Sequence, residues 1–290
     1  MTVSRLRRAD VRYPALLTAI PDPPAVLWLR GDADPAVLGA PAVAVVGARA
    51  CSSYGRAVAR MLGRDLAAAG LTVVSGLARG VDSEAHRGAL DGGGATVAVL
   101  GCGIDKDYPA GHAELARRIC DSEGLIVSEY EPGVEPAPWR FPARNRIIAG
   151  LCAATVVVEA RERSGALITS DFALEDGREV MAVPGEITSA LSAGTNALLR
   201  LGATPVTGSG DVLEALGVEP PARVEGVSSH TGAAATLLRA LADAGAATAD
   251  ELVRSTGMGP GEVAAALVEL ELAGCVSTDD GIHRASRIPR

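Results

Sequence analysis

AVAVVGARACSSYGRAVARMLGRDLAAAGLTVVSG, residues 42–76, predicts a strand, a turn, a helix and a second strand in immediate succession. Its two ends, 42–47 and 71–76, are short β-branched runs, whereas the residues between them carry apolar side chains at helical spacing. Gly70 stands where the helix should stop. Strand, helix and strand joined by short loops predict a right-handed crossover between two parallel strands.

The same alternation continues along the chain. Further β-branched runs lie at 95–101, 124–130, 154–160 and 178–185, and further helical patterns lie at 82–90, 112–120, 144–151 and 166–175. The pattern predicts an α/β protein of the extended Rossmann-like, doubly wound class, with a mainly parallel sheet covered by helices on both faces. Apolar residues make up 48% of the chain but aromatics only 3%, so the core must consist of Ala, Val, Leu and Ile.

The two ends of the chain differ from this alternating middle. Residues 1–40 contain a proline-rich stretch and predict an irregular extension packed on the sheet, ahead of a Rossmann-like domain at 41–220. Residues 221–230 contain Pro, Gly and Ser and predict a linker. Within 231–290, three helical patterns precede a hairpin pattern with its turn at 279–281, which predicts a small C-terminal winged-helix domain.

Composition excludes several classes of protein. The chain has no run of about eighteen apolar residues, so we expect no transmembrane helix and no membrane partner. The basic N-terminus has no apolar stretch behind it, so we expect no signal peptide and a cytoplasmic location. Five widely spaced cysteines and four histidines that do not cluster with them argue against disulfides, a metal site or another cofactor.

The charge of the chain restricts how it could bind nucleic acid. A formal net charge of −8 argues against a generally basic binder, so the positive charge of any such site must be local. Lys106 is the only lysine, and nearly every cation is therefore an arginine, which can grip phosphate oxygens in a two-pronged geometry.

Candidate binding residues lie where the predicted strands end. In an open α/β sheet, ligands bind at the carboxyl edge of the strands, close to helix N-termini. The first such turn holds Gly47 and Arg49, and the arginine occupies the second glycine position of the dinucleotide fingerprint. The second holds Ser75, Gly76 and Arg79, and its small residues leave backbone N–H groups exposed. Each turn also has an alternative interpretation. Arg49 could form a salt bridge at the surface, and the second turn could need glycine for its geometry alone.

The densest cluster of cations is WRFPARNR, residues 139–146, where three arginines stand without an acid. Arginine supplies phosphate contacts, and an aromatic ring can stack on an unpaired base. Because 144–146 fall at the start of the predicted helix, where positive side chains oppose the helix dipole, they indicate an anion site. Trp139 and Phe141 are equally compatible with a place in the core. The candidates from this segment are Arg140, Phe141, Arg144, Asn145 and Arg146.

A last turn follows the run at 154–160, where Ser-Gly opens a helix and suits a phosphate. It supplies the candidates Arg163, Ser164 and Gly165. The sequence contains neither a P-loop motif nor a G-x-S-x-G elbow. We expect Asp82, Glu129 and Glu159 to orient arginines or cap helices rather than to act as acid or base, and we expect no catalytic residue and no enzymatic activity.

Seven motifs, in this order and spacing, resemble the DprA/Smf family of DNA processing proteins from about Tyr13 to Leu216. They are VAVVGAR, VVSGLARGVDSEAH, VAVLGCGID with a following YP, IVSEY, FPARNRIIAGL, VVVEA with RSGALIT, and VPG with GTN. FPARNRIIAGL followed by RSGALIT is the most specific part. The C-terminal part is similar to the winged-helix tail that many members carry.

The resemblance implies an extended Rossmann-fold protein that forms a homodimer and binds single-stranded DNA. Family members are described as protecting incoming DNA and loading the recombinase RecA on it during natural transformation. The family's DNA pocket maps to Gly47 and Arg49, the Ser75-Gly76 turn, 144–146 and the Ser164-Gly165 turn. These are the same turns that the physical argument selects.

The sequence also departs from the family pattern. Ala48 stands where serine is commoner, and Cys152 also replaces a usual serine. The chain begins almost at the Tyr13-Pro14 motif, so we expect the helical N-terminal domain of many members to be absent. From Ser228 onward there are five arginines against eight acids, which favours a protein-contact role for the winged helix over duplex binding.

Two alternative functions stay open at this point. The predicted fold also resembles that of the nucleotide phosphoribohydrolases, which bind a nucleoside monophosphate at the corresponding strand-end turns. Their Pro-Gly-Gly-x-Gly-Thr loop is not matched at 163–168. The second alternative is an adaptor that acts through the winged helix alone.

Overall fold

The computed structural model describes residues 3–219, 232–273, 275–279 and 281–285. The chain divides into two compact units, Met1–Ala222 and Arg223–Arg290. The predicted linker 221–230 and residue 280 of the predicted hairpin turn lie outside the described residues.

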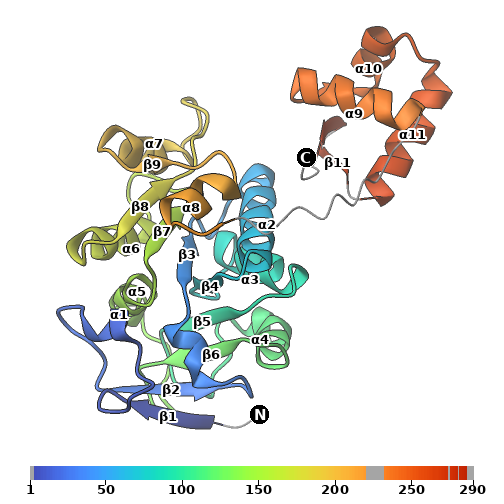
Figure 1. Ribbon diagram of the computed structural model, residues 1–290. Helices are drawn as coiled ribbons and strands as arrows, with labels where there is room; N and C mark the ends of the chain where they lie inside the picture. The colour runs from blue at the N-terminus through green and yellow to red at the C-terminus, as the bar shows by residue number, and fades with distance from the viewer. Residues whose placement is uncertain (1–2, 220–231, 274, 280, 286–290) are drawn as a thin grey trace. The chain divides into compact units, whose positions relative to one another are not determined.

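The buried β-branched runs of the first unit form the strands of one nine-stranded sheet (Figure 1). In chain order these strands are β1 (Val3–Arg7), β2 (Val26–Arg30), β3 (Ala42–Val46), β4 (Thr72–Ser75), β5 (Thr96–Leu100), β6 (Leu125–Ser128), β7 (Ala154–Val157), β8 (Glu179–Ala182) and β9 (Thr204–Pro205). Their order in the sheet is β1-β2-β6-β5-β4-β3-β7-β8-β9. All pairs from β6 to β9 are parallel, which confirms the predicted fold class.

The strand order reverses at β3. From β3 the chain runs outward through β4, β5 and β6 on one side, and then returns to place β7 against the other side of β3. Ligands of doubly wound sheets bind at the carboxyl ends of the strands beside such a reversal. The topology therefore places the candidate site at the ends of β3, β4 and β7.

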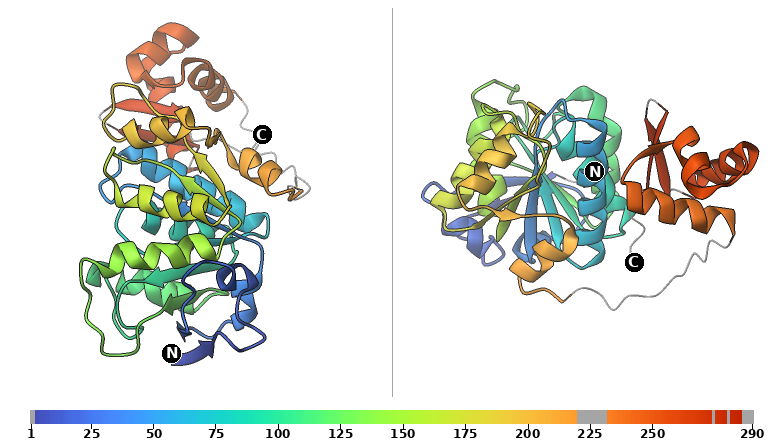
Figure 2. Two further views of the ribbon diagram at one scale, coloured as in Figure 1. Left: turned by 90° about the vertical axis from the view of Figure 1, so that its left-hand side faces the viewer. Right: turned by 90° about the horizontal axis from the view of Figure 1, so that it is seen from above.

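Helices cover both faces of the sheet (Figures 1 and 2). In chain order they are α1 (Ala15–Thr18), α2 (Ser53–Ala68), α3 (Val81–Asp91), α4 (Ala113–Cys120), α5 (Arg140–Gly150), α6 (Gly165–Glu175), α7 (Ala193–Arg200) and α8 (Ser209–Ala215). Helices α2, α3 and α4 lie on one face, and α5 and α6 lie on the other.

The side chains of β3 show how the two cores arise. Val43 and Val45 point into the core beneath α2, where Leu62 lies, whereas Ala44 and Val46 point into the core beneath α5, with Ile147. Successive side chains of a strand face opposite sides, so a strand that is apolar throughout must be covered twice. Each fully buried aliphatic side chain contributes about 1.5–3 kcal/mol.

The N-terminal segment differs from the irregular extension that the sequence predicts. Strand β1 pairs antiparallel with β2, and β2 pairs antiparallel with β6, so both extend the sheet. Leu6, Leu27 and Leu29 are buried beneath the chain that connects the strands. The prolines between the two strands and the shortness of each apolar run weaken the strand pattern in the sequence. The strands form because β2 pairs with β6 and β1 pairs with β2.

The second unit holds α9 (Ala233–Ala244), α10 (Ala249–Thr256) and α11 (Pro260–Leu272) with the short strands β10 (Ala247–Thr248), β11 (Val276–Asp279) and β12 (Ile282–Ala285). The strands form a sheet in the order β10-β12-β11, and Leu237, Leu252 and Val263 are buried between the helices. Three helices and a hairpin wing confirm the predicted winged helix.

No helix in the described ranges combines the length and apolar character needed to cross a membrane. All five cysteines are buried. Within the same ranges, no three His, Cys, Asp or Glu side chains gather in a way that could hold a metal ion.

Candidate nucleic-acid interface

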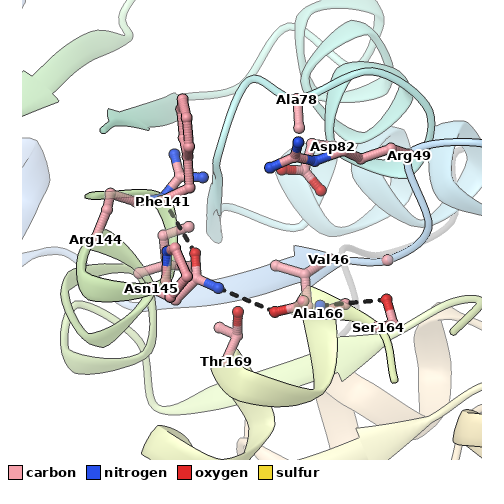
Figure 3. A pocket seen from close by; sticks show the side chains of 14 residues that line it. Val46, Arg49, Ala78, Asp82, Phe141, Arg144, Asn145, Ser164, Ala166 and Thr169 are labelled. Carbon is pink, nitrogen blue, oxygen red and sulfur yellow. Dashed lines mark hydrogen bonds between the residues drawn. The ribbon is translucent and has the colours of Figure 1, made fainter. Parts of the chain in front are cut away.

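The carboxyl ends of β3, β4 and β7 surround a pocket that α5 and α6 close from one side (Figure 3). We call it the strand-edge pocket, and its volume is about 100 Å³. Its lining consists of Val46, Gly47, Arg49, Ala78, Asp82, Phe141, Pro142, Arg144, Asn145, Ile148, Ser164, Gly165, Ala166 and Thr169. Candidates from two separate turns and one helix thus come together at the reversal of the strand order.

Arg49 is the exposed cation of the strand-edge pocket. It extends from the turn between β3 and α2, and its Cζ lies 5.5 Å from the centre of the Phe141 ring. The buried Glu159 holds this turn, because it accepts hydrogen bonds from the backbone N–H (2.9 Å) and the hydroxyl (2.5 Å) of Ser52. Glu159 therefore acts at the start of α2, whose N-cap is Ser52, which agrees with the expected capping role rather than with the orienting of an arginine.

Arg144 is the buried cation of the pocket, with only 4% of its surface exposed. Nη1 donates to the carbonyls of Gly76 (2.9 Å) and Val99, and Nε donates to Oδ1 of Asn145 (3.2 Å). Burial lowers the pKa of Arg144 to about 10, which the nearby Asp82 partly offsets. The guanidinium stays charged at neutral pH, and its Nη2 keeps its donors without an acceptor in the described part of the chain.

Among the described residues, Asp82 is the only acid in the lining of the pocket. Its carboxylate accepts the backbone N–H of Gly76 (3.1 Å), and burial raises its pKa although Arg144 and Arg49 act in the opposite direction. A Cβ on Gly76 would lie 2.5 Å from Nη2 of Arg144. Glycine is therefore required there for the guanidinium to cross the turn.

The turn after β4 also carries backbone strain. Leu77 has a φ of +57°, the left-handed region that non-glycine residues rarely adopt, and its side chain is buried. The carbonyl of Leu77 lies 2.8 Å from Nδ1 of His112. Such strain persists where surrounding contacts hold it, and it concentrates at functional sites.

The N-terminus of α6 forms the floor opposite Arg49 (Figure 3). Ser164 caps it by accepting the N–H of Ala166 (3.3 Å), and the amide of Asn145 donates to the carbonyl of Gly165 (3.0 Å). A Cβ on Gly165 would meet no atom within 4 Å. The open side of this helix start presents N–H groups and the positive end of the helix dipole to the pocket.

Six candidates do not line the pocket, namely Ser75, Gly76, Arg79, Arg140, Arg146 and Arg163. Ser75 is fully buried and donates its hydroxyl to the carbonyl of Val45 (2.7 Å), so its role is to join two strands. Arg79 and Arg163 are exposed in the turns beside the pocket, and neither makes an ion pair within the described residues. Arg140 lies farther along, against Tyr130 and Trp139.

Arg146 points away from the strand-edge pocket. Nη2 donates to Glu129 (2.7 Å) and Nε donates to Asp22 (3.0 Å), so two carboxylates neutralise it. The side chain is 12% exposed. Arg146 therefore connects α5 to the N-terminal segment and to the end of β6, and Glu129 orients an arginine as the sequence suggests.

Helix α5 starts earlier than the sequence predicts, at Arg140 rather than Arg144. The cause is Pro142, which a helix accepts within its first turn. Arg144 and Arg146 consequently lie in the second turn of α5. The effect of the helix dipole falls off beyond the first turn, so it no longer argues for an anion site at these two residues.

Tyr108 is not among the candidate residues that the sequence offers. Its ring stacks on Phe141 with centroids 5.0 Å apart and planes at 30°, and Phe141 also fills the space above Gly101. Tyr108 follows β5 in the loop at the carboxyl edge, so the only available signal was an aromatic residue in a strand-end loop.

Comparisons with known proteins agree with this arrangement. Residues 4–217 match the family of DNA recombination-mediator protein A, and residues 219–281 match the DprA winged-helix domain. The chain is 38% identical to protein Smf of Escherichia coli over 96% of this chain and 77% of that protein.

Two solved structures resemble the first unit and cover 74% of this chain. The X-ray structure of DNA processing protein A from Streptococcus pneumoniae has a TM-score of 0.70 at 44% identity, over 74% of that chain. The structure of DNA processing protein A from Helicobacter pylori has a TM-score of 0.66 at 30% identity, over 96% of that chain, and concerns the binding of single-stranded DNA by that protein.

Proposed function

Because the chain belongs to the DprA/Smf family of DNA processing proteins, we propose that it binds single-stranded DNA in the strand-edge pocket. The Helicobacter pylori relative is described as binding single-stranded DNA. In this chain the backbone phosphates would contact Arg49, Arg144 and the start of α6, while Gly47 and Gly165 allow close approach.

One observation carries the proposal. Arg49 and Arg144, the two cations that line the pocket, form no ion pair within the described residues, and they face the open N-terminus of α6. A buried guanidinium loses hydration, and this cost is offset when an anion binds it. The exposed Arg79 and Arg163 extend the positive charge into the flanking turns. This local charge suits a polyanion even though the whole chain is acidic.

We propose that the protein binds the strand without transforming it. The pocket of about 100 Å³ is smaller than the ~300–1,000 Å³ typical of sites that enclose a small ligand. The one acid in it, Asp82, is engaged by the backbone of Gly76. This favours a backbone-binding site over the nucleotide hydrolase alternative, which predicts release of free base from nucleoside monophosphates.

Family membership supports three finer proposals. The chain would act as a homodimer in the cytoplasm, protect incoming DNA, and load RecA on single strands during transformation. The RecA step is tested by measuring RecA filament formation on DNA coated with single-strand binding protein, with and without this chain. Sedimentation of the free protein tests the dimer.

The site itself is tested by fluorescence anisotropy with single-stranded and duplex oligonucleotides. Arg49→Ala should weaken single-strand binding about tenfold, because a hydrogen bond to a charged group contributes about 1.5–3 kcal/mol. Arg49 is exposed, so the fold should persist.

Arg200→Ala is the matched control. Arg200 is exposed at the end of α7, next to the start of β9 and therefore at the amino edge of the sheet. It changes the net charge equally but should leave binding unaltered. Equal affinities of Arg49→Ala and the unsubstituted protein would refute the strand-edge pocket as the binding site.

A further inference from the structure

Next to the strand-edge pocket lies a second aromatic group, formed by Tyr130, Arg140 and Trp139. The Cζ of Arg140 lies 4.9 Å from the ring centre of Tyr130 and 4.8 Å from that of Trp139. The guanidinium is therefore in contact with both rings. We call this arrangement the Trp139 stack.

The exposed end of the Trp139 stack is an indole. Trp139 is 63% exposed although Arg140 covers part of its ring, so much of its surface faces solvent. Exposing a large aromatic side chain to water costs free energy, and an exposed one near a binding pocket indicates a binding surface. The other tryptophan, Trp28, is only partly exposed and packs against the core.

The charge of the stack is not neutralised by a carboxylate. Arg140 makes no ion pair within the described ranges, and its Nη1 donates instead to the backbone carbonyl of Glu135. Two acids close to it in the sequence have other partners, since Glu135 pairs with Lys106 and Glu129 pairs with Arg146. The stack thus combines an open ring with a positive charge.

The first turn of α5 places the stack beside the strand-edge pocket. Trp139 is the N-cap of α5 and already has helical dihedral angles, and Phe141, two residues later, lines the pocket. Two residues of a helix are about 200° apart around its axis, so the two rings point to nearly opposite sides. A single strand that leaves the pocket past Phe141 therefore has to bend around the first turn of α5 to reach Trp139.

We propose that the Trp139 stack is a base-binding subsite, on which an unpaired base of the strand held in the strand-edge pocket stacks. This inference rests on the proposed function and adds to it a contact with bases. Aromatic stacking accepts any base, since each has a π face, and a cation beneath the ring suits the neighbouring phosphate. The subsite therefore favours single strands over duplexes without reading sequence.

The chain has two tryptophans, which makes the test direct. The Trp28→Phe variant retains Trp139 as its single tryptophan, and its emission is followed during titration with oligo(dT). A strand with the same number of phosphates but abasic sites is the second ligand. Emission should be quenched by oligo(dT) and much less by the abasic strand. In Trp139→Phe, where Trp28 remains, emission should not change.

Affinities of the full chain supply the second readout. Trp139→Ala should weaken oligo(dT) binding about tenfold while leaving the affinity for the abasic strand unchanged. Trp139→Phe, which keeps a ring, should retain most of the affinity. An equal loss for both strands, or binding of oligo(dT) with undiminished Trp139 emission, would overturn the subsite alone. Failure of the unsubstituted protein to bind either strand would overturn the proposed function together with the subsite.

Discussion

Gly165 is the residue of the strand-edge pocket at which a side chain can be added without disturbing the protein. A Cβ there meets nothing within 4 Å, and alanine in a helix is favoured over glycine by up to ~1 kcal/mol. Gly165→Ala should therefore leave the free energy of unfolding unchanged or slightly raised. The added methyl group occupies the space through which a phosphate would approach the N–H groups of α6, so single-strand affinity should fall about tenfold.

Anisotropy titration and urea unfolding measure the two effects separately. Gly210→Ala is the matched control, because Gly210 lies near the start of α8 with equally open space around it and does not line the pocket. If Gly165→Ala binds DNA as tightly as the unsubstituted protein, the strand does not approach the start of α6.

Arg146 is expected to behave in the opposite way. Its side chain is neutralised by Glu129 and Asp22, so Arg146→Ala leaves the partly buried Glu129 without its partner. The free energy of unfolding should fall by about 1–3 kcal/mol, while single-strand affinity stays within about twofold. Urea unfolding and anisotropy titration of one preparation check both. A large loss of affinity with unchanged stability would place Arg146 in the DNA interface after all.

The contrast between Arg49 and Arg146 shows how far the residues of the site can be predicted. Arg49 lies in a strand-end turn and Arg146 at a predicted helix start, and the sequence predicts both as candidate phosphate contacts. Whether an arginine is free depends on residues distant in sequence, here Asp22, and these partners are fixed only by the fold. The same reason applies to Ser75, which does not line the pocket because its hydroxyl donates to the carbonyl of Val45 in a neighbouring strand.

At the scale of elements, α3 is attached to the sheet through a buried polar pair. Nδ1 of His86 lies 2.7 Å from the hydroxyl of Thr96, which donates to the carbonyl of Val73 (2.7 Å). Nε2 of His86 has no hydrogen-bond partner among the residues that the structure describes. Burial lowers the pKa of His86 to about 3, so the side chain is neutral in the folded protein near neutral pH.

This depressed pKa predicts acid lability. The unfolded chain takes up a proton at His86 below a pH of about 6.5, whereas the folded chain does so only near 3. The stability contribution of neutral His86 is therefore complete above 6.5 and is lost as the pH falls toward 3, at up to ~1.4 kcal/mol per pH unit. The raised pKa of Asp82 acts in the opposite direction, so the effect must be measured as a difference between two proteins.

His86→Gln removes the titration but keeps a hydrogen-bonding group. The difference in unfolding free energy between the unsubstituted protein and this variant should shrink as the pH falls below 6.5. Urea unfolding followed by tryptophan emission reports on the first unit, which contains both Trp28 and Trp139. His283→Gln, in the second unit, should leave the pH profile unchanged. Parallel profiles for His86→Gln and the unsubstituted protein would contradict the assignment.

The elements themselves were largely predictable, and the exceptions have local causes. Strands such as β3 and β7 are buried on both faces, so their apolar runs stand out, and Gly47 marks the end of β3. Strands β1 and β2 form the antiparallel end of the sheet, where β1 is mostly exposed and β2 is in part only half-buried, so the signal is weak. Helix α5 starts four residues before the predicted start, because the first turn of a helix accepts Pro142.

At the scale of the whole molecule, charge is divided unevenly between sites. The third helix of a winged helix is the one that enters the major groove. In this chain that helix, α11, carries Glu262, Glu269 and Glu271 and no arginine. A duplex would therefore meet repulsion at the surface that usually binds it. The affinity for DNA should lie in the first unit.

This division predicts how binding responds to salt. For a single strand, the logarithm of affinity falls with the logarithm of salt concentration by about 0.7 for each phosphate neutralised. The triple variant Arg239→Ala, Arg254→Ala and Arg284→Ala removes exposed arginines of the winged helix. It should leave both the affinity and this slope unchanged, because none of the three contacts the strand.

Arg49→Ala, by contrast, should reduce the steepness of the slope by about 0.7, since it removes one phosphate contact. Anisotropy titrations of the three proteins over a series of salt concentrations give the slopes directly. The comparison separates the two units because each variant lowers positive charge in only one of them. A flatter slope for the triple variant, with Arg49→Ala unchanged, would move the strand from the sheet edge to the winged helix.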